Sequence, residues 1–139
     1  MTREVPVDDG KCFACGPDNP DGLRLSFERN PDGSVHATVT LDTKYQGWQG
    51  IAHGGIVMML LDEAMAHASG NAGERGMTAS MSVRFRRQVP LGVALDLHGF
   101  VKWKRGRVLG LEGRVMGPEG ELLATSEGHF VSAGAMDRA

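Results

Sequence analysis

Apolar and polar residues alternate in two short runs near the start of the chain. Residues 23–28 (LRLSFE) and 35–41 (VHATVTL) show this period of two, which is typical of strands with one buried face. The sequence NPDG between the two runs favours a turn. The two runs are therefore predicted to pair as a β-hairpin.

A different pattern follows at residues 56–68 (IVMMLLDEAMAHA). This run lacks proline, glycine and strict alternation, and it is longer than a typical buried strand, so it predicts a helix. Gly70 and Gly73 are expected to end that helix. Because almost every side of the helix is apolar, we expect it to lie wrapped inside the rest of the fold.

The second half of the chain predicts strands joined by short, turn-like links. Four runs carry this pattern, at residues 77–89, 94–104, 107–117 and 121–131. The pattern indicates an α+β fold with an antiparallel sheet of five or six strands curled around one long central helix. An edge strand of such a sheet needs covering, and pairing with a second copy of the chain is one way to cover it.

Length and composition indicate one ordinary globular domain. The chain has 139 residues, of which 41% are hydrophobic and 23% charged. We expect an irregular lead-in at residues 1–22, a single domain at residues 23–133 and a short tail at residues 134–139.

The charge balance and the start of the chain bear on location and partners. A formal net charge of -2 argues against a nucleic-acid or anionic-membrane partner, because such partners attract a surplus of Lys and Arg. The first residues do not resemble a signal peptide, and no apolar run reaches the roughly 18 residues of a membrane span. A cytoplasmic location is expected.

The two cysteines, Cys12 and Cys15, are spaced C-x-x-C. A four-ligand zinc site within one chain would need two further ligands from histidine or carboxylate side chains. Many of the surrounding residues favour turns, and the sequence alone favours a pair of reduced thiols over a metal site. No metal is predicted.

Two adjacent carboxylates, Asp62 and Glu63, lie in the middle of the apolar helix. Carboxylates are rarely buried unless they are paired or used in chemistry, because burial removes their hydration. One interpretation is a catalytic acid. The other is that one carboxylate reaches solvent or pairs with His67 or with an arginine of a neighbouring strand.

The sequence His53-Gly54-Gly55 marks the start of the helix. Amides of a first helical turn have no partner within the helix, and glycine lets a ligand approach closely, so such a turn can stabilise an oxyanion. An ordinary glycine-rich turn is the alternative. Gly54 and Asp62 are eight residues apart, which is roughly 12 Å along a helix. If both serve one reaction, they must come from two subunits related by a two-fold axis.

The segment GWQGIAHGGIVMMLLDEAM resembles the signature of PaaI-type thioesterases of the hotdog superfamily. The lead-in CFACGPDNPDGLRL, the strand SVRFRRQVPLG and the closing ATSEGHFV also resemble members of that family. The resemblance implies a hotdog fold, a dimer and in many members a tetramer, and hydrolysis of an acyl-CoA bound at the subunit interface. Coenzyme A is then part of the substrate, and no separate cofactor is implied.

The resemblance assigns roles by position. Asp62 matches the catalytic acid, which acts as a general base for water or as a nucleophile. Gly54, with Gly55 as a second candidate, matches the oxyanion donor, and His53 matches a histidine that orients the turn. Thr78 matches a hydroxyl residue that assists the attacking water in some members.

This chain departs from the family pattern at one position. Members often carry Asn or Gln six residues before the motif histidine, and Gly47 stands there in this chain. Gln46 and Gln49 are the candidates for the missing polar role. Glu63 is the second candidate acid, although the register of the motif favours Asp62.

Basic residues on the later strands are candidates for binding the phosphates of coenzyme A. They form two groups, one on the strand after the helix and one around a later turn: Arg84, Arg86 and Arg87, and Lys102, Lys104, Arg105 and Arg107. The alternative is an ordinary solvated surface.

Two other functions compete with acyl-CoA hydrolysis. The first is a hotdog hydratase acting on enoyl or hydroxyacyl thioesters, although the motifs of those enzymes are not found in this sequence. The second is a non-catalytic acyl-CoA binding protein. The combination of Asp62 with His53-Gly54-Gly55 favours the hydrolase.

Overall fold

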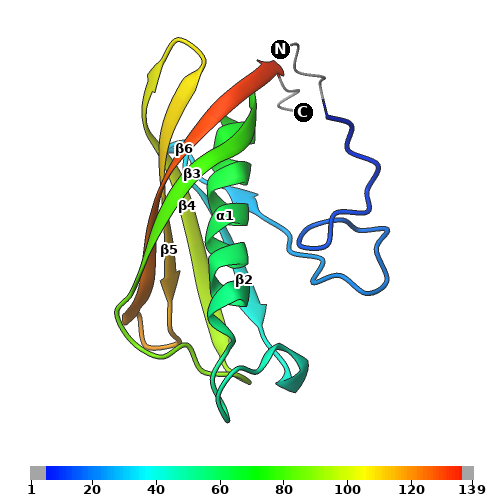
Figure 1. Ribbon diagram of the computed structural model, residues 1–139, viewed down its shortest axis with the longest axis vertical. Helices are drawn as coiled ribbons and strands as arrows, with labels where there is room; N and C mark the ends of the chain where they lie inside the picture. The colour runs from blue at the N-terminus through cyan, green and yellow to red at the C-terminus, as the bar shows by residue number, and fades with distance from the viewer. Residues whose placement is uncertain (1–5, 136–139) are drawn as a thin grey trace.

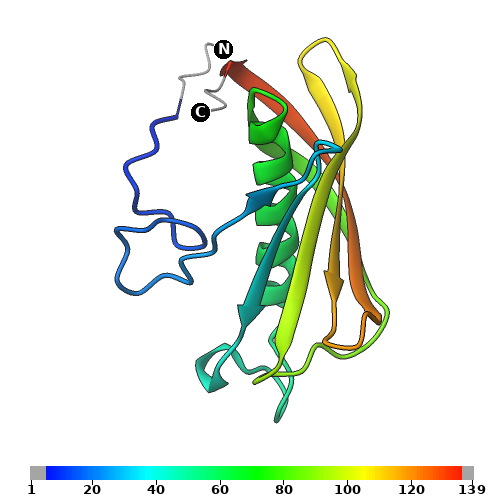
Figure 2. The ribbon, with the colours of Figure 1, turned by 180° about the vertical axis from the view of Figure 1, so that it is seen from behind.

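A computed structural model describes residues 6–135 of the chain (Figure 1). Residues 1–5 of the expected lead-in and residues 136–139 of the expected tail lie outside the described residues. A curved antiparallel sheet packs around one side of a long helix. The view from behind shows the same arrangement (Figure 2). The architecture predicted from the sequence is confirmed.

The sheet has six strands in the order β1-β2-β4-β5-β6-β3, and all neighbouring strands are antiparallel. The elements, in chain order, are β1 (Glu28–Arg29), β2 (Val35–Thr40), the 3-10 helix η1 (Thr43–Tyr45), α1 (Gly54–Asn71), β3 (Glu74–Phe85), β4 (Ala94–Arg105), β5 (Val108–Met116) and β6 (Leu122–Ala135). β6 thus ends two residues beyond the expected domain boundary at residue 133.

Helix α1 is longer at both ends than the run of residues 56–68 that predicted it. His53 caps its start, since the Nδ1 atom accepts a hydrogen bond from the Gly55 amide at 2.9 Å. At the other end Ala72 is the C-cap, and Gly73 follows with a φ of 86°. A histidine cap and a glycine stop therefore set the limits of the helix.

The buried side of α1 forms the centre of the core. Leu60, Leu61 and Met65 are fully buried and pack with the inward-facing residues of the sheet. Gly99 of β4 permits the closest approach, because a Cβ atom there would lie 2.1 Å from the carbonyl oxygen of Ala64. A larger residue at position 99 would push the helix off the sheet.

The strand expected at residues 23–28 is wrong except for its last residue. The amides of Leu23 and Leu25 donate to the carbonyls of Phe13 and Ala14 in the lead-in, so this segment pairs outside the sheet. Arg24 between them has a φ of 53°, which interrupts an extended strand. Only Glu28–Arg29 pairs with β2.

Strand β3 also differs from the run at residues 77–89. It begins earlier, at Glu74, and ends at Phe85 because the amides of Arg86 and Arg87 both donate to the single carbonyl of Leu123. Two residues facing one partner form a bulge that ends the regular pairing. β3 is an edge strand, with β6 as its neighbour on one side only.

The lead-in lies on the side of α1 that faces away from β4, β5 and β6 (Figures 1 and 2). Ala14 and Leu25 are buried in the core, which joins this irregular segment to the domain. Within residues 6–135, no helix is long and apolar enough to cross a membrane.

Candidate active site

The Asp62 carboxylate, in the middle of α1, is hydrogen-bonded to a hydroxyl group on the edge strand. The Thr78 Oγ1 atom donates to Asp62 Oδ1 at 2.6 Å. Asp62 is half-buried and Thr78 is exposed, so the pair faces the open edge of β3. The structure thus brings together two residues that the sequence assigned to one reaction, sixteen positions apart in the chain.

The start of α1 presents one free amide. The Gly55 amide already donates to His53, and the amides of Ile56 and Val57 donate to the His53 carbonyl. Among the described residues, the Gly54 amide has no hydrogen-bond partner. Gly54 is therefore the donor that this turn can offer to a ligand.

Phe85 lies beside this free amide. A Cβ atom built on Gly54 would lie 3.7 Å from the Phe85 Cζ atom, and 51% of Phe85 is exposed. Phe85 was not among the site residues predicted from the sequence. The sequence feature that could have indicated Phe85 is its position at the end of a strand, directly before two arginines.

The two halves of the candidate site lie apart within one chain. Gly54 is the first residue of α1 and Asp62 is the ninth, so the helix separates them by roughly 12 Å. A single thioester carbon cannot reach both groups of the same copy. The side chain of His53 is exposed and engaged in the cap, which agrees with an orienting role.

Gln46, one candidate for the polar role near the motif histidine, is engaged in its own loop. The Gln46 Oε1 atom accepts from the Gly50 amide at 3.0 Å, so this side chain holds the loop together. Gly47 packs against His53, because a Cβ atom there would lie 3.1 Å from the His53 Cα atom. Gln49 is exposed, and its side chain has no hydrogen-bond partner in residues 6–135.

Glu63 points away from the Asp62–Thr78 pair, toward the lead-in. Its carboxylate lies 3.1 Å from His67 Nε2, and only 15% of the side chain is exposed. Burial opposes ionisation, but the hydrogen bonds from His67 and Cys15 outweigh it and lower the pKa of Glu63. Burial, with the Glu63 carboxylate beside it, raises the pKa of the Cys15 thiol.

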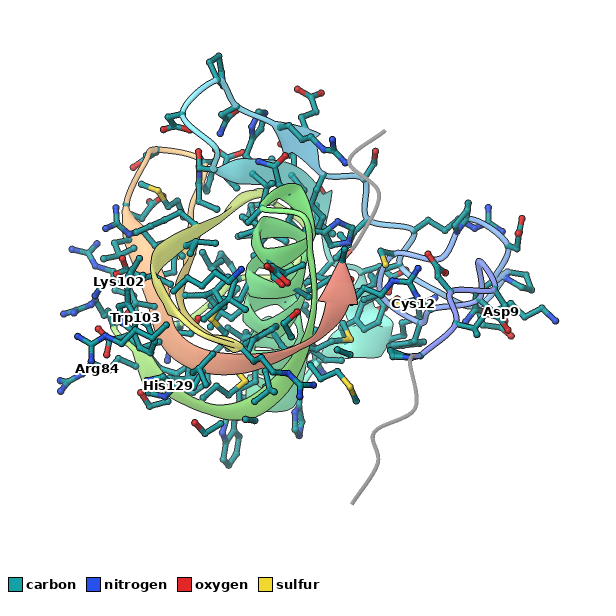
Figure 3. All side chains as sticks on the ribbon, turned by 90° about the horizontal axis from the view of Figure 1, so that it is seen from above. Asp9, Cys12, Arg84, Lys102, Trp103 and His129 are labelled. Atoms are coloured by element: carbon teal, nitrogen blue, oxygen red, sulfur yellow. The ribbon has the colours of Figure 1, made fainter. Side chains whose placement is uncertain are left out.

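The three arginines of the first basic group do not all lie on the same side of the sheet. Arg86 and Arg87 line a cavity of about 390 Å³ together with Gly54 and Phe85. Arg84 instead points to the outer side of the sheet, the side on which Lys102 also lies (Figure 3). Two of the three predicted arginines therefore lie at the free amide.

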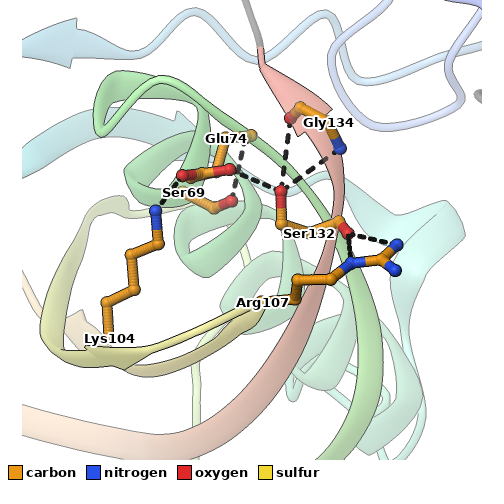
Figure 4. A network of polar contacts seen from close by, with 6 residues as sticks. All are labelled: Ser69, Glu74, Lys104, Arg107, Ser132 and Gly134. Atoms are coloured by element: carbon orange, nitrogen blue, oxygen red, sulfur yellow. Dashed lines mark hydrogen bonds and ion pairs between the residues drawn. The ribbon is translucent and has the colours of Figure 1, made fainter.

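The second basic group lies at the other end of the molecule, around the turn between β4 and β5. Arg107 donates to the Ser132 carbonyl at 3.2 Å, and Lys104 pairs with Glu74, as Figure 4 shows. The Arg105 guanidinium lies over the Trp103 ring, with its Cζ atom 5.8 Å from the ring centroid. Within one chain, this group is not brought to Gly54 or to Asp62.

The sequence of this chain matches the model of a known protein family. The model of a family described as the thioesterase superfamily matches residues 49–124, more than half of the chain, including α1 and β3. The chain belongs to the thioesterase superfamily. The resemblance to PaaI-type members of the hotdog superfamily is confirmed at the level of superfamily and fold.

Solved structures give the same fold. The crystal structure of a thioesterase superfamily protein is 34% identical, covers 94% of this chain and 68% of its own, and superposes with a TM-score of 0.85. A Streptococcus mutans protein bound to acetyl-CoA is 19% identical, with a TM-score of 0.75 over 81% of this chain and 91% of its own. The E. coli PaaI protein from the phenylacetic acid degradation operon is 18% identical, with a TM-score of 0.75 over 82% and 83%.

Among curated proteins, an uncharacterised mitochondrial protein of Candida albicans is 32% identical over 108 residues. The match covers 76% of this chain and 48% of that protein, so the chain spans about half the length of this relative.

Proposed function

We propose that this chain hydrolyses acyl-CoA thioesters as a dimer in which each reaction centre combines Asp62 of one copy with the Gly54 amide of the other. The observation that carries the proposal is the Thr78–Asp62 hydrogen bond of 2.6 Å on an open edge strand. Thr78 fixes one carboxylate oxygen, Oδ1, and so orients the other, Oδ2, for a water molecule.

Pairing of two β3 strands supports this assembly. β3 is a long edge strand whose outer side has no neighbouring strand among residues 6–135, and such edges are commonly covered by a second strand. An antiparallel pair with its two-fold axis midway between Thr78 and Phe85 lays Phe85 of one copy opposite Thr78 of the other. Because Gly54 lies beside Phe85, its free amide then approaches Asp62 of the other copy.

The reaction follows from these two groups. Asp62 takes a proton from water while the water oxygen attacks the thioester carbon, and the Gly54 amide donates to the oxyanion that forms. The carbon–sulfur bond then breaks, and the proton held by Asp62 goes to the departing thiolate. The products are a free acid and coenzyme A. A direct attack by the carboxylate is the alternative that the sequence leaves open.

The cavity beside Gly54 suits the nucleotide part of the substrate. Arg86 and Arg87 offer guanidinium groups, which bind phosphate oxygens through paired hydrogen bonds, next to the amide that receives the oxyanion. A solved structure of the same fold, from Streptococcus mutans, is described as bound to acetyl-CoA. We assign the coenzyme A phosphates to this cavity.

The proposal is tested by a screen of aromatic and aliphatic acyl-CoAs of graded length, read by release of free thiol. We expect thiol release with at least one class of acyl group, at a rate that depends on Asp62. Addition of water to an enoyl-CoA without thiol release would indicate a hydratase. Stoichiometric binding without turnover across the screen would indicate a binding protein, and either result would reject the hydrolase.

Removing the hydroxyl group that orients Asp62 gives a prediction for Thr78. Thr78→Val keeps the shape of the side chain but loses a hydrogen bond to a charged group, which contributes about 1.5–3 kcal/mol. We expect kcat to fall by about 10- to 100-fold. Thr78→Ser is the matched control, since it keeps the hydroxyl group and should recover most of the rate; equal losses in both variants would reject the orienting role.

Tetramer formation and a cytoplasmic location stay predictions from the sequence. The relative from Candida albicans is named as a mitochondrial protein, so location is best determined by fractionation of the source cells.

A further inference from the structure

The carboxylate next to the proposed catalytic acid belongs to a second group of residues. Glu63 faces the lead-in, where the ligand atoms of Cys12, Cys15 and Glu63 all lie within 4.8 Å of one another. His67 Nε2 lies 3.1 Å from the same carboxylate. We propose that Cys12, Cys15, Glu63 and His67 bind one zinc ion, which fastens the lead-in to α1.

The chemistry of the four side chains suits zinc. Two thiolates, an imidazole and a carboxylate are the ligand types that Zn²⁺ takes in tetrahedral protein sites, and sulfur ligands select zinc over magnesium or calcium. Zinc–ligand bonds of about 2.0–2.3 Å place ligand atoms about 3.3–3.8 Å apart. The separation of His67 and Glu63 is already close to this range, and the sulfur atoms need to move by about 1 Å.

The turn around the cysteines is built for a metal ligand. The Cys15 amide lies 3.5 Å from Cys12 Sγ, where it can donate to a thiolate. Gly16 closes the turn, because a Cβ atom there would lie 2.3 Å from the Cys12 backbone nitrogen. Cys12 is exposed, so its side chain can adjust to an ion.

The orientations of the other two proposed ligands, Glu63 and His67, are fixed by their surroundings. Phe27 stacks on the His67 ring, with centroids 4.4 Å apart, and so sets the orientation of the imidazole. Glu63 and His67 are one turn apart on α1, which makes their spacing rigid. Glu63 and His67 are therefore held in place before an ion binds.

The surroundings can admit an ion. A cavity of about 650 Å³ is lined by all four residues and by three further carboxylates, Asp8, Asp9 and Glu74. In Figure 3, Cys12 and Asp9 lie in the lead-in, on the side of α1 opposite to the labelled residues of the sheet. The cation in the lining is Arg75, whose guanidinium donates to the Pro6 carbonyl at 3.1 Å. Four protein ligands leave no open coordination position, so the site is structural.

The test measures zinc in the full chain, purified under reducing conditions and supplied with Zn²⁺. We expect one zinc per chain by elemental analysis, and competition with a chromophoric chelator gives the affinity. Cys12→Ser should lose stoichiometric zinc, and His67→Ala should weaken binding by at least about 10- to 100-fold. Asp62→Asn is the matched control, because it changes the neighbouring carboxylate of α1 outside the cluster and should bind zinc like the wild type.

Three results would overturn the zinc site. They are a wild-type chain that keeps no zinc, a Cys12→Ser variant that keeps as much zinc as the wild type, and a Cys12–Cys15 disulfide that persists under the reducing conditions. Circular dichroism on each variant separates loss of the ion from loss of the fold. The measurement does not depend on hydrolysis, so it stands apart from the proposed function.

Discussion

Replacing Asp62 with asparagine lowers kcat/KM for acyl-CoA hydrolysis by about 10²- to 10⁴-fold, the contribution expected of a general base. The amide has the shape of the carboxylate, and its oxygen still accepts the Thr78 hydroxyl, so the fold and the Asp62–Thr78 contact survive. The variant loses only the ability to take a proton from water. Steady-state kinetics with the best substrate of the screen, together with a thermal melt, measure both effects.

Asp96 provides a matched control for this variant. Its carboxylate also accepts a threonine hydroxyl, from Thr38 at 3.1 Å, but the pair lies on β2 and β4 rather than on α1 and β3. Asp96→Asn should therefore keep the wild-type rate. If Asp62→Asn keeps more than about a tenth of the wild-type rate, Asp62 is not the general base.

Gly54→Pro is expected to lower kcat by about 10²- to 10³-fold, because proline removes the one amide that is free to stabilise the oxyanion. Position 54 tolerates proline for physical reasons. It is the first residue of α1, where the amide has no partner in the helix, and His53 before it has a ψ of 136°, as a residue before proline requires.

The fold should withstand this change. The nearest side-chain atom to a Cβ at position 54 is Phe85 Cζ at 3.7 Å, an ordinary contact. The free energy of unfolding should equal or exceed that of the wild type, since proline reduces the freedom of the unfolded chain. Gly54→Ala adds a side chain but keeps the amide, so it should lose far less activity. Equal losses in the two variants would mean that bulk, not the amide, matters.

The sequence predicted the large elements well because their signals are local. The apolar run at residues 56–68 has helical length and lacks breakers, and it became the core of α1. The NPDG turn joins β1 and β2 as expected, with the Gly33 amide donating to the Asn30 carbonyl. Such features depend on neighbours in the chain, so a single sequence reveals them.

The errors arose where distant segments compete for the same backbone groups. Leu23 and Leu25 alternate like a strand, but their amides bond to the lead-in instead of to β2. The cysteine turn gave no sign that it would meet Glu63, because that contact joins segments about fifty residues apart. Tertiary packing alone decides such pairings, and the expectation of a pair of reduced thiols there stays a prediction.

The candidate site was predicted in part from the sequence. The family resemblance assigned Asp62, Gly54 and Thr78 to one reaction, and the structure adds the hydrogen bond that links Thr78 to Asp62. It also shows that the Gly55 amide is already engaged by His53, which leaves Gly54 as the oxyanion donor in the proposal. Hydrogen bonding of individual amides depends on side-chain rotamers, which a sequence pattern does not specify.

The shared reaction centre is tested most directly by mixed dimers of Asp62→Asn and Gly54→Pro chains, co-expressed with different affinity tags and purified on both. In such a dimer one centre carries both defects, and the other combines an intact Asp62 with an intact Gly54. We expect each variant alone to be nearly inactive and the mixed dimer to recover about half of the wild-type rate. A mixed dimer no more active than its two parents would contradict the account, because it would place both groups of each centre on a single chain.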